Sequence, residues 1–245
     1  MRCRSLERRT RRGKAGGRPA PKCLLVDLGG VLIADPRDIV VRGLRPADGI
    51  DLRRVSEEYR SLSRRLDADR LTLRRMFGTL QRKFRVRLAW KEFRSLVESK
   101  SLVLNRDVSR SLTRLTKHSQ VRVVIASNTS RYVWRGLHKK YDIARIFPRP
   151  VLSYRIGSLK PSRRFFRVLL RRANCAPKDA YFLDDAGENV AAARSLGIRS
   201  RLVTGPGDAA RFLRSLERAT SSAAARGRRN ADSPIPRRPQ GRIGT

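Results

Sequence analysis

Short apolar runs and amphipathic stretches alternate along most of the chain. Runs such as "CLLVD" (23–27) and "VRVVIA" (121–126) are rich in aliphatic residues and free of Gly and Pro, which is typical of buried strands. The stretches between them carry apolar residues at every third or fourth position, which predicts helices. The pattern predicts strands over 23–27, 121–126, 150–153, 180–183 and 200–203, and helices near 131–140, 161–173, 187–196 and 207–217.

Strands that are separated by helices favour an α/β fold. We expect a Rossmann-like parallel sheet flanked by helices, because parallel neighbours need crossover connections of this kind. The predicted core comprises residues 21–36 and 104–217. Ligands of such sheets bind at the carboxyl ends of the strands, so this edge is where functional residues are sought.

The segment between the first two predicted strands contains only helical patterns. We therefore expect an all-helical cap over 37–103, inserted after the first core strand and placed above its end. Three apolar stripes define its helices: Leu52, Val55, Tyr59, Leu62 and Leu66; Leu73, Met76, Phe77, Leu80 and Phe84; and Trp90, Phe93, Leu96 and Val97.

Both ends of the chain differ from the centre. Residues 1–20 and 218–245 are rich in Arg and small residues without apolar period, so we expect disordered basic tails. The N-terminal segment lacks the apolar centre of a secretory signal, and no apolar run reaches the roughly 20 residues of a membrane span. The three cysteines form no CxxC pair, which suits a reducing, cytoplasmic location.

The charge balance is strongly basic. The 245 residues include 58 Lys and Arg against 21 Asp and Glu, a formal net charge of +37. Subtracting the 16 basic and 2 acidic residues of 1–22 and 218–245 leaves 42 and 19, so positions 23–217 still carry +23. Such a surface attracts polyanions non-specifically. Since 48 of the 58 are Arg and they are spread over every segment, a compositional bias explains them better than a specific nucleic-acid site.

Chemically versatile residues follow several of the predicted strands. The first strand ends in an acid and is followed by two glycines, which permit close approach to the backbone. Because the carboxyl ends of parallel strands meet at one edge, these residues are expected to converge. The set comprises Asp27, Ser127, Asn128, Lys160 in the turn "SYRIGSLKP", and the pair Asp184 and Asp185.

This set suits phosphoryl transfer. Mg²⁺ prefers carboxylate oxygens, waters and substrate phosphate as ligands, and a lysine counters charge on the phosphoryl oxygens. An aspartate can also act as a covalent nucleophile. Each residue has a plainer explanation by itself: a solvated turn carboxylate, a capping hydroxyl or a surface lysine. Their joint occurrence at one sheet edge favours a site.

Four motifs, "DLGGVL", "SNTS", "SYRIGSLKP" and "FLDDAGENV", occur in order over about residues 22–205. In this the chain resembles the haloacid dehalogenase-like hydrolase superfamily, most closely its small bacterial phosphatase-like members with a DLGG or DLGN first motif. The resemblance implies a helical cap between the first two motifs and a Mg²⁺-dependent phosphatase. For the metal, the resemblance implies that Asp27 is both nucleophile and ligand, that Gly29 offers its carbonyl, and that Asp184 is a ligand with Asp185 as an indirect partner. For the substrate, it implies that Ser127 and Asn128 bind it and that Lys160 stabilises Asp27 and the phosphate. It also implies that Asn189 fixes the loop.

One position departs from the commonest phosphatase pattern. Gly29 stands where that pattern has a second Asp that serves as general acid and base, a function worth on the order of 10²–10⁴ in rate. The dehalogenase branch also lacks this Asp. A 2-haloacid dehalogenase therefore stays an alternative, although carbon–halogen displacement needs no metal and gives the paired aspartates little purpose.

The preferred interpretation is a hydrolase that acts on a small phosphomonoester, with sugar phosphates as the expectation from the resemblance, through an aspartyl-phosphate on Asp27. A weakly active or non-catalytic polyanion-binding protein is the third hypothesis, without a recognition helix or basic-aromatic strand to support it. We expect a phosphorylated metabolite as partner, no specific nucleic-acid site and no membrane; the sequence leaves the oligomeric state open.

Overall fold

A five-stranded parallel sheet forms the centre of the molecule, in a computed structural model that describes residues 20–231. The spatial order is β3-β2-β1-β4-β5, so the chain builds the sheet outward from β1 on one side and then returns to its other side. The predicted α/β class and all five predicted strands are confirmed. The strands are β1 (Cys23–Val26), β2 (Arg122–Ser127), β3 (Val151–Leu152), β4 (Ala180–Asp184) and β5 (Arg199–Leu202).

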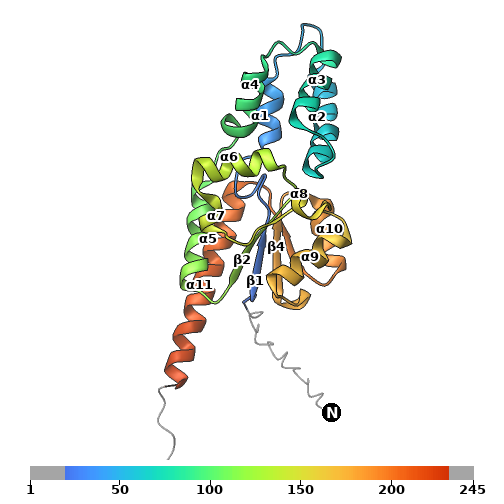
Figure 1. The fold of residues 1–245 in the computed structure, drawn as a ribbon. Coiled ribbons are helices and arrows are strands. Elements are labelled where there is room, and N and C mark those ends of the chain that lie inside the picture. The colour runs from blue at the N-terminus through green and yellow to red at the C-terminus, as the bar shows by residue number, and fades with distance from the viewer. Residues whose placement is uncertain (1–19, 232–245) are drawn as a thin grey trace, which may run out of the picture.

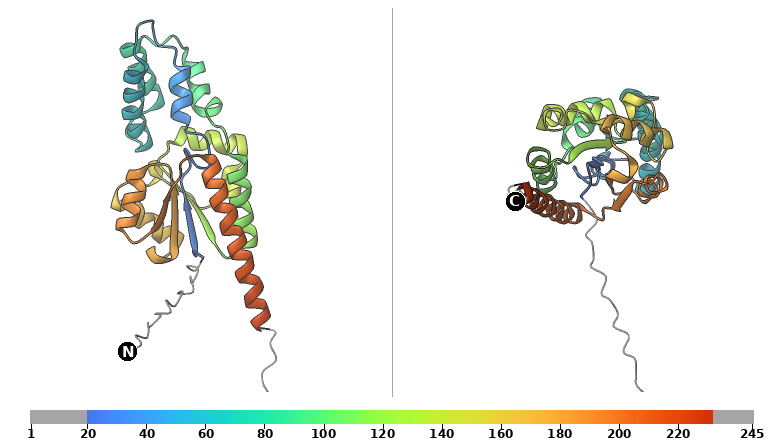
Figure 2. Two further views of the ribbon diagram at one scale, coloured as in Figure 1. Left: turned by 180° about the vertical axis from the view of Figure 1, so that it is seen from behind. Right: turned by 90° about the horizontal axis from the view of Figure 1, so that it is seen from below.

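Helices cover both faces of the sheet, as Figures 1 and 2 show. Successive side chains of a strand point to opposite faces. In β1, Leu24 and Val26 pack with α5, α6 and α11, whereas Cys23 and Leu25 pack with α9 and α10. Each face therefore has its own apolar core, which is why β1 is apolar throughout. The helices of this part are α5 (Arg106–His118), α6 (Arg131–Tyr141), α7 (Ile143–Ile146), α8 (Ser153–Ile156), α9 (Arg163–Ala173), the short 3₁₀ helix Pro177–Asp179, α10 (Gly187–Ser195) and α11 (Pro206–Ala231).

A separate helical unit stands over the carboxyl ends of the strands (Figure 1). Its own apolar core contains most residues of the three stripes together with Val40, Val41 and Leu44, whereas Leu52 of the first stripe is exposed. The helices of the unit occupy 36–100, whereas the expected range was 37–103. The unit therefore starts one residue earlier and ends three residues earlier than expected, and its first helix was not indicated by any stripe. It consists of α1 (Pro36–Gly43), α2 (Leu52–Asp67), α3 (Leu73–Phe84), α4 (Trp90–Ser95) and the π-helix Leu96–Lys100.

Two linkers join this unit to the sheet, and they run side by side. The amide of Ala34 donates to the carbonyl of Val103, and the amide of Asn105 donates to the carbonyl of Leu32. Further contacts hold the unit against the core. Ser153 Oγ donates to the carbonyl of Asp67 at 2.7 Å, and the π-helix packs against α6.

The long C-terminal helix corrects one expectation. We expected disorder over 218–245, but α11 continues to Ala231. The segment "SSAAAR" within it is rich in Ala, the strongest helix former, and this outweighs the lack of an apolar stripe. Residues 1–19 and 232–245, which make up the rest of the two predicted tails, lie outside the described residues. Within 20–231, no helix combines the length and the apolar character that a membrane span requires.

Candidate active site

Three aspartates converge at the carboxyl edge of the sheet. Asp27 directly follows β1, Asp184 ends β4 and Asp185 follows it, and β1 and β4 are neighbours at the point where the chain reverses its direction across the sheet. One carboxylate oxygen from each lies within 4.8 Å of the others. Open α/β sheets bind ligands at such reversal points. The structure thus brings together the acids that the sequence placed on separate strands.

Lys160 lies between two of these acids. Its ammonium group is 2.7 Å from Asp27 Oδ1 and 2.6 Å from Asp184 Oδ2, and its side chain is only 1% exposed. The backbone amide of Leu28 also donates to Asp27 Oδ1, at 2.7 Å. Asp27 Oδ2, by contrast, has no hydrogen-bond partner within 20–231. The arrangement fixes the carboxylate of Asp27 and leaves one oxygen available.

The tip of β2 holds the lysine loop in place. Asn128 accepts a hydrogen bond from the Lys160 amide at 2.8 Å and donates to the Lys160 carbonyl at 2.9 Å. Both ends of its amide group are therefore occupied, which gives Asn128 a positioning role in this structure. Ser127 is 1% exposed and lines the same cavity, and its hydroxyl has no hydrogen-bond partner among the described residues.

The two glycines after Asp27 have different structural reasons. Gly30 has a positive φ of 73°, and a Cβ there would lie 2.0 Å from a carboxylate oxygen of Asp185. A glycine is needed there because the backbone passes directly beside that acid. Gly29 has room for a Cβ atom, whose nearest neighbour would be Pro36 Cδ at 3.8 Å, and it lines the cavity. The missing second Asp is therefore not a steric necessity.

The pKa shifts within the cluster show that its negative charges are only partly balanced by Lys160. The pKa of Asp27 is raised to about 7: burial is the largest cause, Lys160 opposes it, and the charges of Asp184 and Asp185 add to it. Burial and the neighbouring Asp184 likewise raise the pKa of Asp185. Burial disfavours the charged form of Lys160, but its two carboxylate partners outweigh this and raise its pKa. Three acids face one lysine, so a further cation would favour their ionised forms.

The residues present fit a hydrated divalent cation. The donor set is all oxygen, as Mg²⁺ prefers. Asp184 is fully buried, and both of its oxygens are engaged: Oδ2 with Lys160, and Oδ1 with the Ala186 amide and Asn189 Nδ2, each at 2.9 Å. Asn189 Oδ1 is buried without a partner among the described residues. An acceptor orphaned beside three carboxylates is well placed for a metal-bound water.

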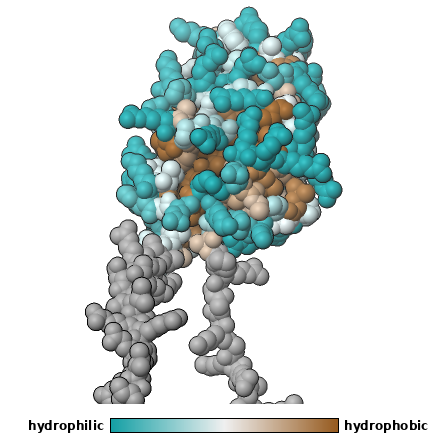
Figure 3. All heavy atoms as spheres, turned by 60° about the horizontal axis from the view of Figure 1, so that its bottom comes forward, coloured by the Kyte–Doolittle hydropathy of each residue, from teal (hydrophilic) through white to brown (hydrophobic). Residues whose placement is uncertain are grey.

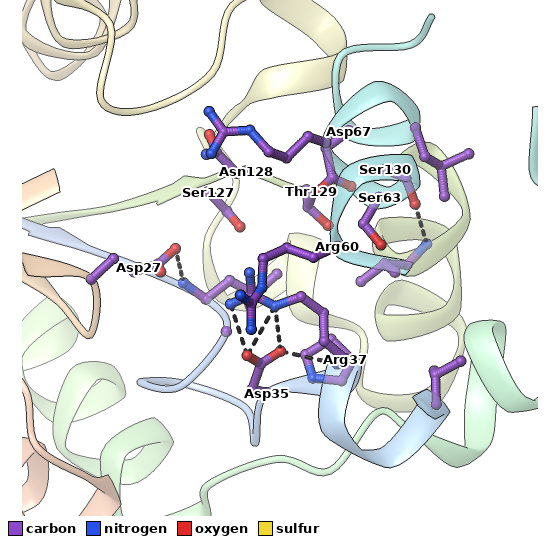
Figure 4. Close-up of a pocket in the computed structure, with 18 of the residues that line it drawn as sticks. Asp27, Asp35, Arg37, Arg60, Ser63, Asp67, Ser127, Asn128, Thr129 and Ser130 are labelled. Atoms are coloured by element: carbon purple, nitrogen blue, oxygen red, sulfur yellow. Dashed lines mark hydrogen bonds and ion pairs between the residues drawn. The ribbon is translucent and has the colours of Figure 1, made fainter. Parts of the chain in front are cut away.

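A cavity of about 430 Å³ opens from this cluster toward the helical unit. Asp27, Ser127 and Lys160 form its floor, and α1 and α2 supply its opposite wall (Figure 4). Arg37, at the start of α1, forms a 2.7 Å ion pair with Asp35. Of the residues on this wall, the sequence pattern identified only Tyr59 and Leu66, because apolar stripes mark the buried face of a helix and not the face that meets a cavity. The polar residues of this wall include Arg37, Arg60, Ser63 and Asp67.

A family model described as haloacid dehalogenase-like hydrolase matches residues 21–197 of the chain. This range is well over half of the 245 residues and contains every residue of the cluster. The chain belongs to the haloacid dehalogenase-like hydrolase family. The resemblance stated from its four motifs and the assignment as a hydrolase are thereby confirmed.

Solved structures of this family share the fold. A HAD family enzyme from Bacteroides thetaiotaomicron has a TM-score of 0.64 at 21% identity, covering 76% of this chain and 95% of that one. The L-2-haloacid dehalogenase from Xanthobacter autotrophicus, solved with chloropropionic acid covalently bound, has a TM-score of 0.56 at 15% identity, covering 75% and 77%. At these identities the likeness shows the fold alone.

Curated relatives match over shorter segments. Rat bifunctional epoxide hydrolase 2 is 27% identical over 127 residues, which are 49% of this chain and 22% of that protein. Drimenol cyclase of Aspergillus calidoustus is 36% identical over 85 residues, which are 35% of this chain and 16% of that protein. The chain thus spans less than a quarter of either relative.

Proposed function

We propose that this hydrolase is a Mg²⁺-dependent phosphatase that acts on a small phosphomonoester, with Asp27 as the nucleophile. The observation that carries the proposal is the convergence of three carboxylates and one buried lysine on the floor of a cavity. The Bacteroides enzyme was also solved in complex with magnesium and inorganic phosphate, at 22% identity to this chain. That complex supports the choice of metal and of ligand.

The contacts of the site residues support the following roles in the reaction. Asp27 Oδ2 attacks phosphorus, so an O–P bond to the carboxylate forms as the ester O–P bond breaks and the alcohol leaves with a proton from solvent. Water then hydrolyses the aspartyl-phosphate, releasing inorganic phosphate and restoring the carboxylate. Ser127 and Lys160 bind the phosphoryl oxygens. Asp27, Asp184 and Asp185, with the Gly29 carbonyl, would hold Mg²⁺, which supplies positive charge opposite the phosphoryl group.

For Asn128 we propose a role other than the expected contact with substrate. Its amide clamps the backbone of Lys160, so we assign it to positioning that lysine and not to contact with substrate. The absence of an acid at Gly29 leaves leaving-group protonation to water. The enzyme should therefore favour esters of acidic alcohols, whose departure needs little proton transfer.

The nucleophile assignment is tested by Asp27→Asn. The amide has the size of the carboxylate but cannot form the aspartyl-phosphate, so turnover of a phosphomonoester panel with Mg²⁺ should fall by at least ~10³-fold. Circular dichroism should show the parental helix content. If the variant hydrolysed these esters at the parental rate, Asp27 would not be the nucleophile.

A 2-haloacid dehalogenase is the second candidate, favoured by the glycine at position 29 and by the fold shared with the Xanthobacter enzyme. In that reaction Asp27 would displace halide from carbon, and no metal is required. A chelator distinguishes the two candidates. We expect phosphomonoester hydrolysis that is lost with EDTA and restored by Mg²⁺, and no chloride release from 2-chloropropionate.

A further inference from the structure

One face of α2 forms the wall of the cavity opposite Asp27. The residues of this face recur every three or four positions, beside the apolar stripe that anchors α2 in its own unit. Most of them are hydroxyl-bearing or charged, so the wall facing a bound molecule is polar. Leu66 is its apolar member, and the others are Ser56, Tyr59, Arg60, Ser63, Arg64 and Asp67.

Arg60 differs from the other cations of the cavity in its partners. Lys160 is paired with Asp27 and Asp184, Arg37 with Asp35, and Arg64 lies 3.9 Å from Glu188. Arg60 forms no hydrogen bond or ion pair with any residue of the described chain. In Figure 4 its side chain extends from α2 across the cavity toward the side on which Asp27 lies. Its guanidinium group is thus free to bind an anion bidentately.

A buried hydroxyl on the core side points to the same ligand region. Thr129 Oγ1 is buried, with the residue 3% exposed, and has no hydrogen-bond partner among the described residues. A buried polar atom without a partner is unfavourable, so such atoms generally meet a ligand or water. Figure 4 shows Thr129 and Ser63 on facing sides of the cavity, one from the core and one from α2.

We propose that the substrate carries a second anionic group, a carboxylate or a further phosphate, and that Arg60 binds it while Thr129 donates a hydrogen bond to the same end of the molecule. The phosphate to be transferred occupies the floor beside Ser127 and Lys160, so the second group lies on the leaving alcohol. This deepens the proposed function and rests on it. The cavity of about 430 Å³ is within the range for small ligands, roughly 300–1,000 Å³.

Asp67 shares this wall without excluding an anion. Burial raises the pKa of its carboxyl group to about 7, and Arg37 only partly opposes the shift. Near neutral pH a large share of Asp67 is therefore uncharged, which limits its repulsion of a second anion and leaves a hydroxyl that can donate to one.

The test compares phosphomonoesters that differ by one anionic group. The first pair is 3-phosphoglycerate and glycerol 3-phosphate, and the second is glucose 1,6-bisphosphate and glucose 6-phosphate. In each pair, the first compound carries a second anionic group. The full chain with Mg²⁺ should prefer that compound in at least one pair by about tenfold in kcat/KM, equivalent to about 1.4 kcal/mol. Arg60→Gln should reduce that ratio to about one. Arg65→Gln, which removes the same charge from α2 outside the cavity lining, should retain the parental ratio.

The outcomes separate this inference from the proposed function. If the parent does not discriminate within either pair, or Arg60→Gln slows both members equally, then Arg60 does not bind a second anion and the inference is wrong, whereas phosphatase activity stands. If no ester of any panel is hydrolysed, the proposed function fails. Calorimetry then measures binding of the same pairs to Asp27→Asn and to the double variant that also carries Arg60→Gln, without turnover. If Arg60→Gln selectively weakens binding of the compound with the second anionic group, the inference is supported. If both compounds of each pair bind with equal affinity, it is overturned.

Discussion

Lys160 is the residue on which the charge balance of the site depends. It is fully buried between Asp27 and Asp184, and a buried ion pair contributes little net stability while it is intact. Removing one partner is different, because the remaining charges are then buried without compensation. The lysine therefore has a structural duty that exists before any substrate binds.

We expect Lys160→Met to lower the free energy of unfolding by roughly 3–5 kcal/mol in metal-free buffer near pH 8. The cause is that two buried carboxylates lose their counter-charge. Urea unfolding followed by circular dichroism measures the change. Lys22→Met is the matched control, since the Lys22–Asp179 pair is exposed and should contribute at most about 1 kcal/mol. Equal losses in both variants would contradict the structural duty of Lys160.

Asp67 gives a second expectation at this scale, in the pH dependence of stability. Its pKa is raised by burial from 3.8 to about 7, so the folded protein holds this proton more tightly than the unfolded chain does. The resulting stabilisation is complete below the unfolded pKa and is lost as the pH rises through about 7. We expect Asp67→Asn to reduce the fall in metal-free melting temperature between pH 5 and pH 8.

The matched control for Asp67 is an exposed acid. Asp107→Asn on α5 removes a carboxylate from the surface, so comparing it with Asp67→Asn isolates the effect of burial from the loss of one negative charge. A fall in melting temperature that is as steep in Asp67→Asn as in the parent would show that Asp67 does not hold its proton into the neutral range.

At the scale of elements, the helical unit and the core approach each other closely at Gly136. A Cβ at this position in α6 would lie 2.0 Å from the carbonyl oxygen of Glu98 and 2.7 Å from Leu102 Cδ1. The first contact is with backbone of the π-helix, which cannot yield without displacing the helical unit. Small residues allow helices to pack this closely, and here only glycine fits.

We expect Gly136→Ala to destabilise the protein by about 1–3 kcal/mol, because overpacking forces the two elements apart. Activity should fall as well, since the cavity lies between the same two parts. Gly78→Ala in α3 is the control: its nearest neighbour is the flexible Arg82 side chain at 3.5 Å, so it should stabilise by roughly 0.5–1 kcal/mol. Thermal unfolding compares the two, and a neutral Gly136→Ala would show that α6 and the π-helix can separate freely.

Most elements with a regular apolar pattern could be predicted from the sequence. The exception is α5, which was not predicted although Val108, Leu112 and Leu115 form a buried stripe along it. The strands are short continuous apolar runs, because helices cover both faces of the sheet. The helices carrying Leu62, Leu80 and Phe93 have clear periodicity, because each buries one continuous face. The helix α1 was missed because only Val40 and Val41 of its eight residues are buried. The end of α11 was missed because its helical preference comes from Ala and not from an apolar face.

The floor of the site was predictable and its wall was not. Asp27 and Asp184 follow apolar strands, and parallel topology brings such ends together. The positions of Arg60 and Asp67 depend on how α2 docks over the sheet, which is set by long-range contacts such as that of Asp67 with Ser153. The nearest signal in the sequence was a second stripe, Ser56, Arg60, Ser63 and Asp67, whose serines stand among longer charged residues.

At the scale of the whole molecule, two features govern how a substrate reaches the site. The cavity lies between the core and a helical unit that is joined to it by paired linkers, so access depends on how these parts move relative to each other. The second feature is charge. Hydrophilic side chains are spread over the face drawn in Figure 3, with hydrophobic surface between them, and do not gather over one element. The basic residues are spread over every segment of the sequence, so we expect the net charge of +37 to give a broad positive potential.

A broad positive potential should accelerate the encounter with a phosphorylated substrate without altering the chemical step. We expect kcat/KM for a dianionic phosphomonoester to fall several-fold as NaCl rises from about 50 to about 500 mM at fixed Mg²⁺, because salt screens the charges beyond a few ångströms. The value of kcat at saturating substrate should change little, since the bound ester is held by short contacts that salt screens weakly. A short single-stranded oligonucleotide should bind weakly and be released over the same salt range. If the oligonucleotide instead remained bound to Asp27→Ala at high salt, the Arg-rich surface would contain a built polyanion site, and the compositional explanation of the charge would be wrong.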